Sequence, residues 1–333
     1  MNNGTFHPQL LLFLALENGG FHAFLGFFIA VLLLIPMFGL LPAYFYTIKL
    51  NKERDKMTPI YPIFNHFSNV VIVIAVLGPF PFACILYLFT YAPNREERSD
   101  GFENVLSLLL FLAVLIFWGL KMVTQVQYVL HFLLAVQRFF IYFYPGSEKY
   151  VTLSEKRMKY LLWLLYLISF VEEVRSAQIY KLPDDCRSAL LSHDLFVFLS
   201  LNVLLSLGAL LYIPVTISVA KFSGLSSAIQ YKPQNYIFLQ VVSSLSTRIF
   251  LIFYISEMYF FPDYMNQMSM WIITFLDICV TPLTIELTYL LCNKRNASTF
   301  FSLTLDEFVK IVCLSKQPAA RVHPLQHIQS TQV

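Results

Sequence analysis

The chain has 333 residues, of which 57% are apolar, 17% are aromatic and only 13% are charged. A soluble domain carries about a quarter of charged residues, so this composition predicts a protein whose solvent is lipid. The formal net charge of +3 is too small, and its cations too dispersed, for a nucleic-acid-binding protein.

Seven mainly apolar runs of about 20 residues or more follow one another along the chain, and that length crosses a bilayer as a helix. Helices are expected because a backbone surrounded by lipid must satisfy its hydrogen bonds within the segment. The expected spans are about 21–48, 61–90, 105–144, 159–180, 194–220, 236–261 and 268–292. The sequence therefore predicts an all-α membrane protein with a seven-helix transmembrane domain over residues 21–292.

The third run, 105–144, is long enough for one tilted helix or for two short spans, and the charges of the loops decide between them. With one helix, fifteen lysines and arginines fall on one side and four on the other. The fifteen are Lys49, Lys52, Arg54, Lys56, Lys149, Lys156, Arg157, Lys159, Lys221, Lys232, Lys294, Arg295, Lys310, Lys316 and Arg321. The four are Arg95, Arg98, Lys181 and Arg187. Because cytoplasmic loops are enriched in cations, this split predicts an extracellular N-terminus over 1–20 and a cytoplasmic tail over 293–333.

The two ends of the chain carry candidate surface features. In the tail, the spacing of apolar residues over about 299–313 predicts a short amphipathic helix on the membrane surface. Cys313 at its end is a candidate for palmitoylation or a free thiol. Asn3 begins an Asn-Gly-Thr glycosylation sequon in the predicted outer segment, which is either used or a chance triplet.

A cation stands at the predicted inner end of the third helix. Gln137-Arg138-Phe139 is followed by Pro145, seven residues after the arginine. This arrangement resembles the D-R-Y…P element of rhodopsin-like receptors, in which the arginine holds the inactive bundle and meets the G protein. The aspartate and tyrosine of that element are absent, and the seventh span keeps only a proline, Pro282, of the N-P-x-x-Y element. The resemblance implies rhodopsin-like receptor architecture, with Arg138 and Pro145 as the candidate G-protein-coupling residues.

Two longer stretches carry a closer resemblance that covers nearly the whole chain. Residues 133–145 read LLAVQRFFIYFYP, and residues 231–237, before the sixth span, read YKPQNYI. Both are similar to the nematode serpentine chemoreceptors of class Z. The resemblance implies a receptor in the plasma membrane, in the sensory cilium of chemosensory neurons, that signals through a heterotrimeric G protein.

Ionisable residues inside the predicted spans are costly and usually face the bundle interior. Counting about 1.5 Å per residue from the cytoplasmic ends, Glu172, Arg248 and Asp277 lie roughly 18–23 Å deep and Lys121 roughly 25 Å deep. This layer predicts the floor of a small-molecule pocket, or alternatively a set of structural ion pairs. Helix rotation is not fixed by the sequence, so the pairing among the four stays open.

Catalytic and cofactor chemistry finds no support in the sequence. There is no nucleophile elbow, glycine-rich phosphate loop or metal-binding cysteine spacing, and the seventh span has no lysine for a retinal Schiff base. The predicted function is that of a G-protein-coupled chemosensory receptor that binds a small molecule from outside, without enzyme activity, cofactor or metal. A transporter or ligand-gated channel that uses the charge layer, and a trafficking or scaffold membrane protein, are the alternatives.

Overall fold

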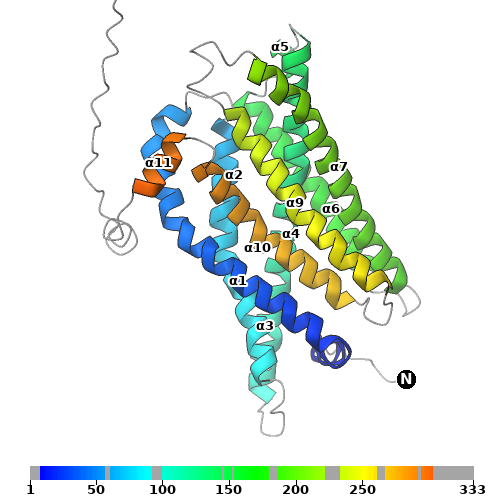
Figure 1. Cartoon of the computed structure of the whole chain (residues 1–333). Helices are drawn as coiled ribbons and strands as arrows, with labels where there is room; N and C mark the ends of the chain where they lie inside the picture. Colours follow the sequence, from blue (N-terminus) through cyan, green and yellow to red (C-terminus); the bar gives the residue numbers. More distant parts are fainter. Residues whose placement is uncertain are drawn as a thin grey trace, which may run out of the picture.

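The computed structural model describes residues 8–56, 61–91, 100–144, 146, 148–151, 154–179, 187–221, 233–260, 267–291 and 294–302. Every regular element within these ranges is an α-helix, and the long helices run side by side as a bundle (Figure 1). The helices are α1 (Pro8–Lys56), α2 (Tyr61–Leu77), α3 (Pro79–Tyr91), α4 (Asp100–Phe143), α5 (Glu148–Val151), α6 (Glu155–Ile179), α7 (Arg187–Lys221), α9 (Pro233–Phe260), α10 (Gln267–Leu291) and α11 (Lys294–Ser302). The short helices α5 and α11 lie at one end of the bundle, here called the α11 end, and the other end is the far end (Figure 1).

The second span is made of two helices in line. At Gly78 the backbone N–H still donates to the carbonyl of Ile74 at 2.8 Å, but Pro79 has no N–H with which to continue the pattern. Together α2 and α3 supply the expected span at 61–90, broken by a proline of the kind that membrane helices tolerate.

The helix α4 occupies the centre of the bundle and contacts α2, α3, α6, α7 and α10, whereas α1 packs chiefly along α10. Gly208 of α7 lies against α4, where a Cβ would make ordinary contacts of 3.6 Å with both Ala135 Cβ and Phe132 Cα. At 44 residues, α4 is about 66 Å long and exceeds the bilayer core, so it either tilts or projects from the membrane.

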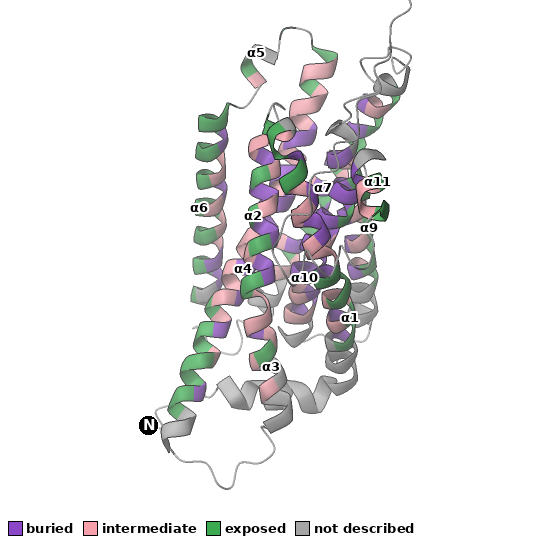
Figure 2. Ribbon diagram, turned by 90° about the vertical axis from the view of Figure 1, so that its left-hand side faces the viewer, coloured by how far each residue is buried: buried purple, intermediate pink, exposed green. Residues whose placement is uncertain are grey.

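Six spans of the described chain are long and apolar enough to cross a membrane, and they include the paired helices α2 and α3. The exception among the long helices is α6, whose part toward the far end holds Glu172, Glu173 and Arg175. Its 25 residues are nevertheless about 38 Å long. Its outward face is apolar and aromatic, with Tyr160 and Trp163 each 76% exposed, and it forms the edge of the bundle (Figure 2). A face of this kind is suited to contact with lipid.

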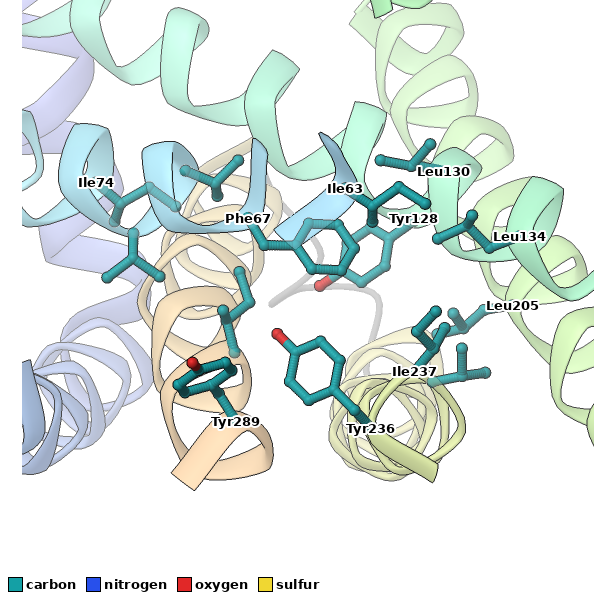
Figure 3. Close-up of a cluster of buried hydrophobic side chains, with 14 of the residues drawn as sticks. Ile63, Phe67, Ile74, Tyr128, Leu130, Leu134, Leu205, Tyr236, Ile237 and Tyr289 are labelled. Atoms are coloured by element: carbon teal, nitrogen blue, oxygen red, sulfur yellow. The ribbon is translucent and has the colours of Figure 1, made fainter. Parts of the chain in front are cut away.

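A cluster of large buried side chains fills the bundle interior (Figure 3). Its aromatic part lies toward the α11 end, where α2 begins and α10 ends. The ring centroid of Tyr236 of α9 lies 6.4 Å from that of Phe67 of α2 and 6.0 Å from that of Tyr289 of α10. Tyr44 of α1 meets Tyr289 edge to face at 5.5 Å. Rings from α1, α2, α9 and α10 therefore pack into one aromatic cluster, which couples the positions of these four helices at this end.

The tail helix α11 is held against the bundle by a chain of polar contacts. Asn51 donates to the side-chain oxygen of Asn296 at 3.0 Å, and Asn296 donates to the carbonyl of Tyr289, also at 3.0 Å. Phe301 is 74% exposed on the opposite face of α11. α11 begins at Lys294, five residues before the helix expected at about 299–313, and residues 303–313 lie outside the described chain.

Candidate functional site

A small cavity lies among α4, α6, α7 and α10 toward the far end of the bundle. Its volume is about 20 Å³, which is room for about one water molecule. The lining residues are Phe117, Trp118 and Lys121 of α4, Glu173 and Ser176 of α6, Asp194 of α7, and Met270, Trp271 and Thr274 of α10. One wall is ionic and the other is aromatic.

The ionic wall is a three-residue group, the cavity cluster, formed by Lys121, Glu173 and Asp194. The Lys121 ammonium lies 2.9 Å from Glu173 Oε1 and 3.4 Å from Asp194 Oδ1. The side chain of Gln125, one turn along α4, donates to the same Glu173 oxygen at 3.3 Å. One cation thus joins three helices, and any molecule that disturbs Lys121 changes the contacts among all three.

Glu172 stands beside the cavity cluster rather than in it. Its Oε1 atom lies 3.6 Å from His193 Nε2, and neither of its carboxylate oxygens accepts a hydrogen bond from the described residues. Arg175 contacts the same His193 nitrogen. Because an arginine only donates, this contact makes His193 Nε2 an acceptor.

A second ionic group, the buried triad of Tyr128, Arg248 and Asp277, lies deeper in the bundle. Arg248 donates from Nη2 to Asp277 Oδ2, and the Tyr128 hydroxyl donates to Asp277 Oδ1 at 2.6 Å. The guanidinium carbon lies 3.9 Å from the centroid of the Tyr128 ring, and Arg248 is 2% exposed. The triad fastens α4, α9 and α10 together where water has no access.

Arg138 lies near the α11 end of α4 and is half-buried. It makes no ion pair with the described residues, and its Nε atom is buried without a hydrogen-bond partner among them. The neighbouring Gln137 donates to the carbonyl of Val151 at 3.0 Å and so holds the turn that follows α4. Gly146, in the turn after α4, has a φ of 95°. Glycine adopts this left-handed conformation without strain because it has no Cβ.

The four candidate pocket residues thus fall into separate groups. Arg248 and Asp277 pair directly, Lys121 lines the cavity, and Glu172 lies next to it. The cavity residues that sequence reasoning did not select are Glu173, Asp194 and the rings around them. Pro145, Asn3 and Cys313 lie outside the described residues, so the structure adds nothing about them. No group of three or more metal-ligating side chains occurs within the described chain.

Comparison with known families completes the picture. The family model for the serpentine type 7TM GPCR chemoreceptor Srz matches residues 27–294, which is most of the chain. The chain belongs to this family. Neither a curated protein nor a solved structure matches it significantly. The match confirms the class Z resemblance and the prediction of a seven-helix bundle, and it makes the receptor a multi-pass membrane protein of a chemoreceptor family rather than an enzyme.

Proposed function

We propose that this receptor binds a small molecule in the cavity at the far end of the bundle and activates a heterotrimeric G protein at the α11 end. The observation that carries the proposal is the continuity of α4. One helix without an internal proline bears Lys121 in the cavity wall, Tyr128 in the buried triad and Arg138 near its other end. The family, which consists of chemoreceptors, supports the same assignment.

The contacts of Lys121 suggest how a ligand acts. A molecule that enters the cavity competes for the carboxylates of Glu173 and Asp194, which belong to α6 and α7. Rearrangement there shifts α4 relative to both helices. Because the buried triad ties α4 to α9 and α10, the shift passes to the helices that surround the α11 end. A ligand drives this change only by as much as it prefers the shifted arrangement.

Arg138 is the proposed contact with the G protein. Within the described chain no carboxylate neutralises it, so its planar fork of donors is available for the backbone carbonyls of an inserted helix. The alternative role is that of a topology anchor at the phosphate level, where a long cationic side chain is inexpensive. With the N-terminus outside, the α11 end faces the cytosol, and the receptor belongs in the plasma membrane of a chemosensory neuron, in its sensory cilium.

The test is nucleotide exchange by a promiscuous G protein in membranes from cells that express the full-length receptor, screened against small water-soluble and volatile molecules. With any activating compound, Arg138→Ala is expected to lower the exchange rate at least tenfold at unchanged surface expression, and Arg138→Lys is expected to retain part of it. The matched control is Arg157→Ala, because Arg157 is an exposed cation at the same end.

Wild-type exchange by Arg138→Ala would show that the arginine is an anchor. A ligand-evoked current that persists when the G protein is blocked would show the transporter or channel alternative instead. The absence of any ligand response across the screen would favour the scaffold alternative.

A further inference from the structure

Four polar side chains, here called the polar layer, meet in the bundle interior. They are His66 of α2, Gln127 and His131 of α4, and Gln240 of α9, with exposed fractions of 9%, 1%, 1% and 0%. His66 and Gln240 are both electrostatic neighbours of His131. The Phe67 ring lies 5.4 Å from the His131 ring and 6.2 Å from the His66 ring. The layer therefore brings three helices together at a place where bulk water has no access.

The polar layer holds more donors and acceptors than it pairs. Gln127 Nε2 lies 3.3 Å from His131 Nε2. Because an amide nitrogen only donates, His131 Nε2 accepts, and the neutral ring carries its proton on Nδ1. That Nδ1 atom, Gln127 Oε1, His66 Nε2 and both polar atoms of the Gln240 amide make no hydrogen bond with the described residues. Most buried polar side-chain atoms in proteins have a partner, so five bare atoms in one place point to a bound molecule.

The chemistry of these atoms decides what can bind them. An apolar molecule would leave all of them without a hydrogen bond, which is costly for a buried group. A transition metal would find two imidazoles, but no carboxylate or thiolate belongs to the layer to offset its charge. A water molecule is neutral and both donates and accepts. One buried water typically makes two to four hydrogen bonds to groups that lack a protein partner.

We propose that the polar layer is a binding site for ordered water molecules that link α2, α4 and α9. At about three hydrogen bonds for each water, two waters suffice for the bare atoms. On α4 the layer lies between Tyr128 of the buried triad and Arg138. Because water reorients and changes partners, His131 and Gln240 keep their hydrogen bonds when α4 and α9 move relative to each other. The site goes beyond the proposed function and does not depend on which ligand the receptor binds.

The first test is X-ray radiolysis of the full-length receptor in lipid nanodiscs, followed by mass spectrometry of the oxidised peptides. Ionised bound water forms hydroxyl radicals where it lies, so the side chains beside it are oxidised although bulk water does not reach them. Phe67 is 0% exposed and lies next to His131, and it is expected to be oxidised in the wild type. In the double variant with His131→Phe and Gln240→Met, the oxidation of Phe67 is expected to fall several-fold.

The sign of a stability change is the second test. Gln240→Met keeps the length of the side chain and removes both of its polar atoms. If water satisfies Gln240, the change deprives that water of partners and lowers the midpoint of thermal unfolding by a few degrees. If Gln240 is bare, the change removes two unsatisfied atoms and raises the midpoint. The matched control is Ile237→Met, at an equally buried position one turn away on α9, which measures the cost of methionine itself.

Three results would overturn the water site. A higher midpoint in Gln240→Met would show that the layer is dry. A lower midpoint without oxidation of Phe67 in the wild type would show that Gln240 bonds His131 directly. Zinc or copper retained by the receptor, purified without a metal-affinity step, and lost in His66→Phe and in His131→Phe would show a metal site instead. Each of these results leaves the proposed function standing, because ligand-evoked nucleotide exchange is measured separately.

Discussion

Arg248 and Asp277 form an ion pair, and both residues are buried, with exposed fractions of 2% and 6%. Two of the three guanidinium nitrogens of Arg248, Nε and Nη1, donate no hydrogen bond to the described chain, and the guanidinium lies among the rings of Tyr128 and Phe198 instead. Burying both charges costs free energy that a good geometry only offsets, whereas burying one alone is strongly unfavourable. The pair is therefore expected to matter most when it is broken.

We predict that Asp277→Asn and Arg248→Met each destabilise the receptor by about 3–5 kcal/mol, because each leaves one buried group without its partner. The double variant is expected to lose much less than the sum of the two. The measurement is the midpoint of thermal unfolding in nanodiscs, evaluated as a double-mutant cycle. Strictly additive losses would mean that the two side chains act independently.

At the residue scale, charge at bilayer depth selects the four candidate residues, whose ligand role stays a prediction, but it does not say which of them pair. Which of Glu172 and Glu173 faces Lys121 could not be found, since neighbours on a helix point about 100° apart and the rotation of α6 depends on its packing. Asp194 was not selected from the sequence, because it is the first residue of an apolar run and therefore looks like the boundary of a membrane span.

Helix packing sets the next scale, and the contact between α4 and α7 leaves little space beside Gly208. A Cβ at Gly208 would make ordinary contacts of 3.6 Å with α4, but a larger group would overlap it. We predict that Gly208→Ala leaves the unfolding midpoint nearly unchanged and that Gly208→Ile destabilises by about 1–3 kcal/mol, with weaker ligand responses, because it separates the two helices.

The matched control is Gly119→Ile, since a Cβ on Gly119 of α4 would meet nothing within 4 Å. Equal losses at the two positions would indicate that isoleucine acts through the helix backbone and not through the contact between α4 and α7.

The helices themselves follow from composition because lipid leaves few choices. Apolar runs bounded by charged loops predict a helical bundle, and the all-helical fold confirms this. α6 is the least apolar of the long helices. The sequence predicts a membrane span there only if its charged residues are taken to face the bundle interior. The break at Gly78–Pro79 and the early start of α11 depend on local hydrogen bonds such as that of Asn51 to Asn296, which apolar periodicity does not report.

For the molecule as a whole, the orientation in the membrane remains a prediction from the loop charges. An epitope tag before residue 8 is expected to be stained by antibody in intact cells, and a tag after residue 320 only after the cells are permeabilised. The physical reason is the excess of lysine and arginine in the loops at the α11 end. The reverse staining pattern would place Arg138 outside the cell and contradict the coupling assignment.

The ion pair of Arg248 with Asp277 bears on how the receptor responds to the membrane potential. A single charge that moves across a membrane exchanges about 2.3 kcal/mol with a potential of 100 mV, which is how voltage sensors work. A neutral pair that moves as one body transports no net charge, so the field does no work on it. The Arg248–Asp277 pair therefore contributes no voltage dependence to a movement of the helices that carries both residues together.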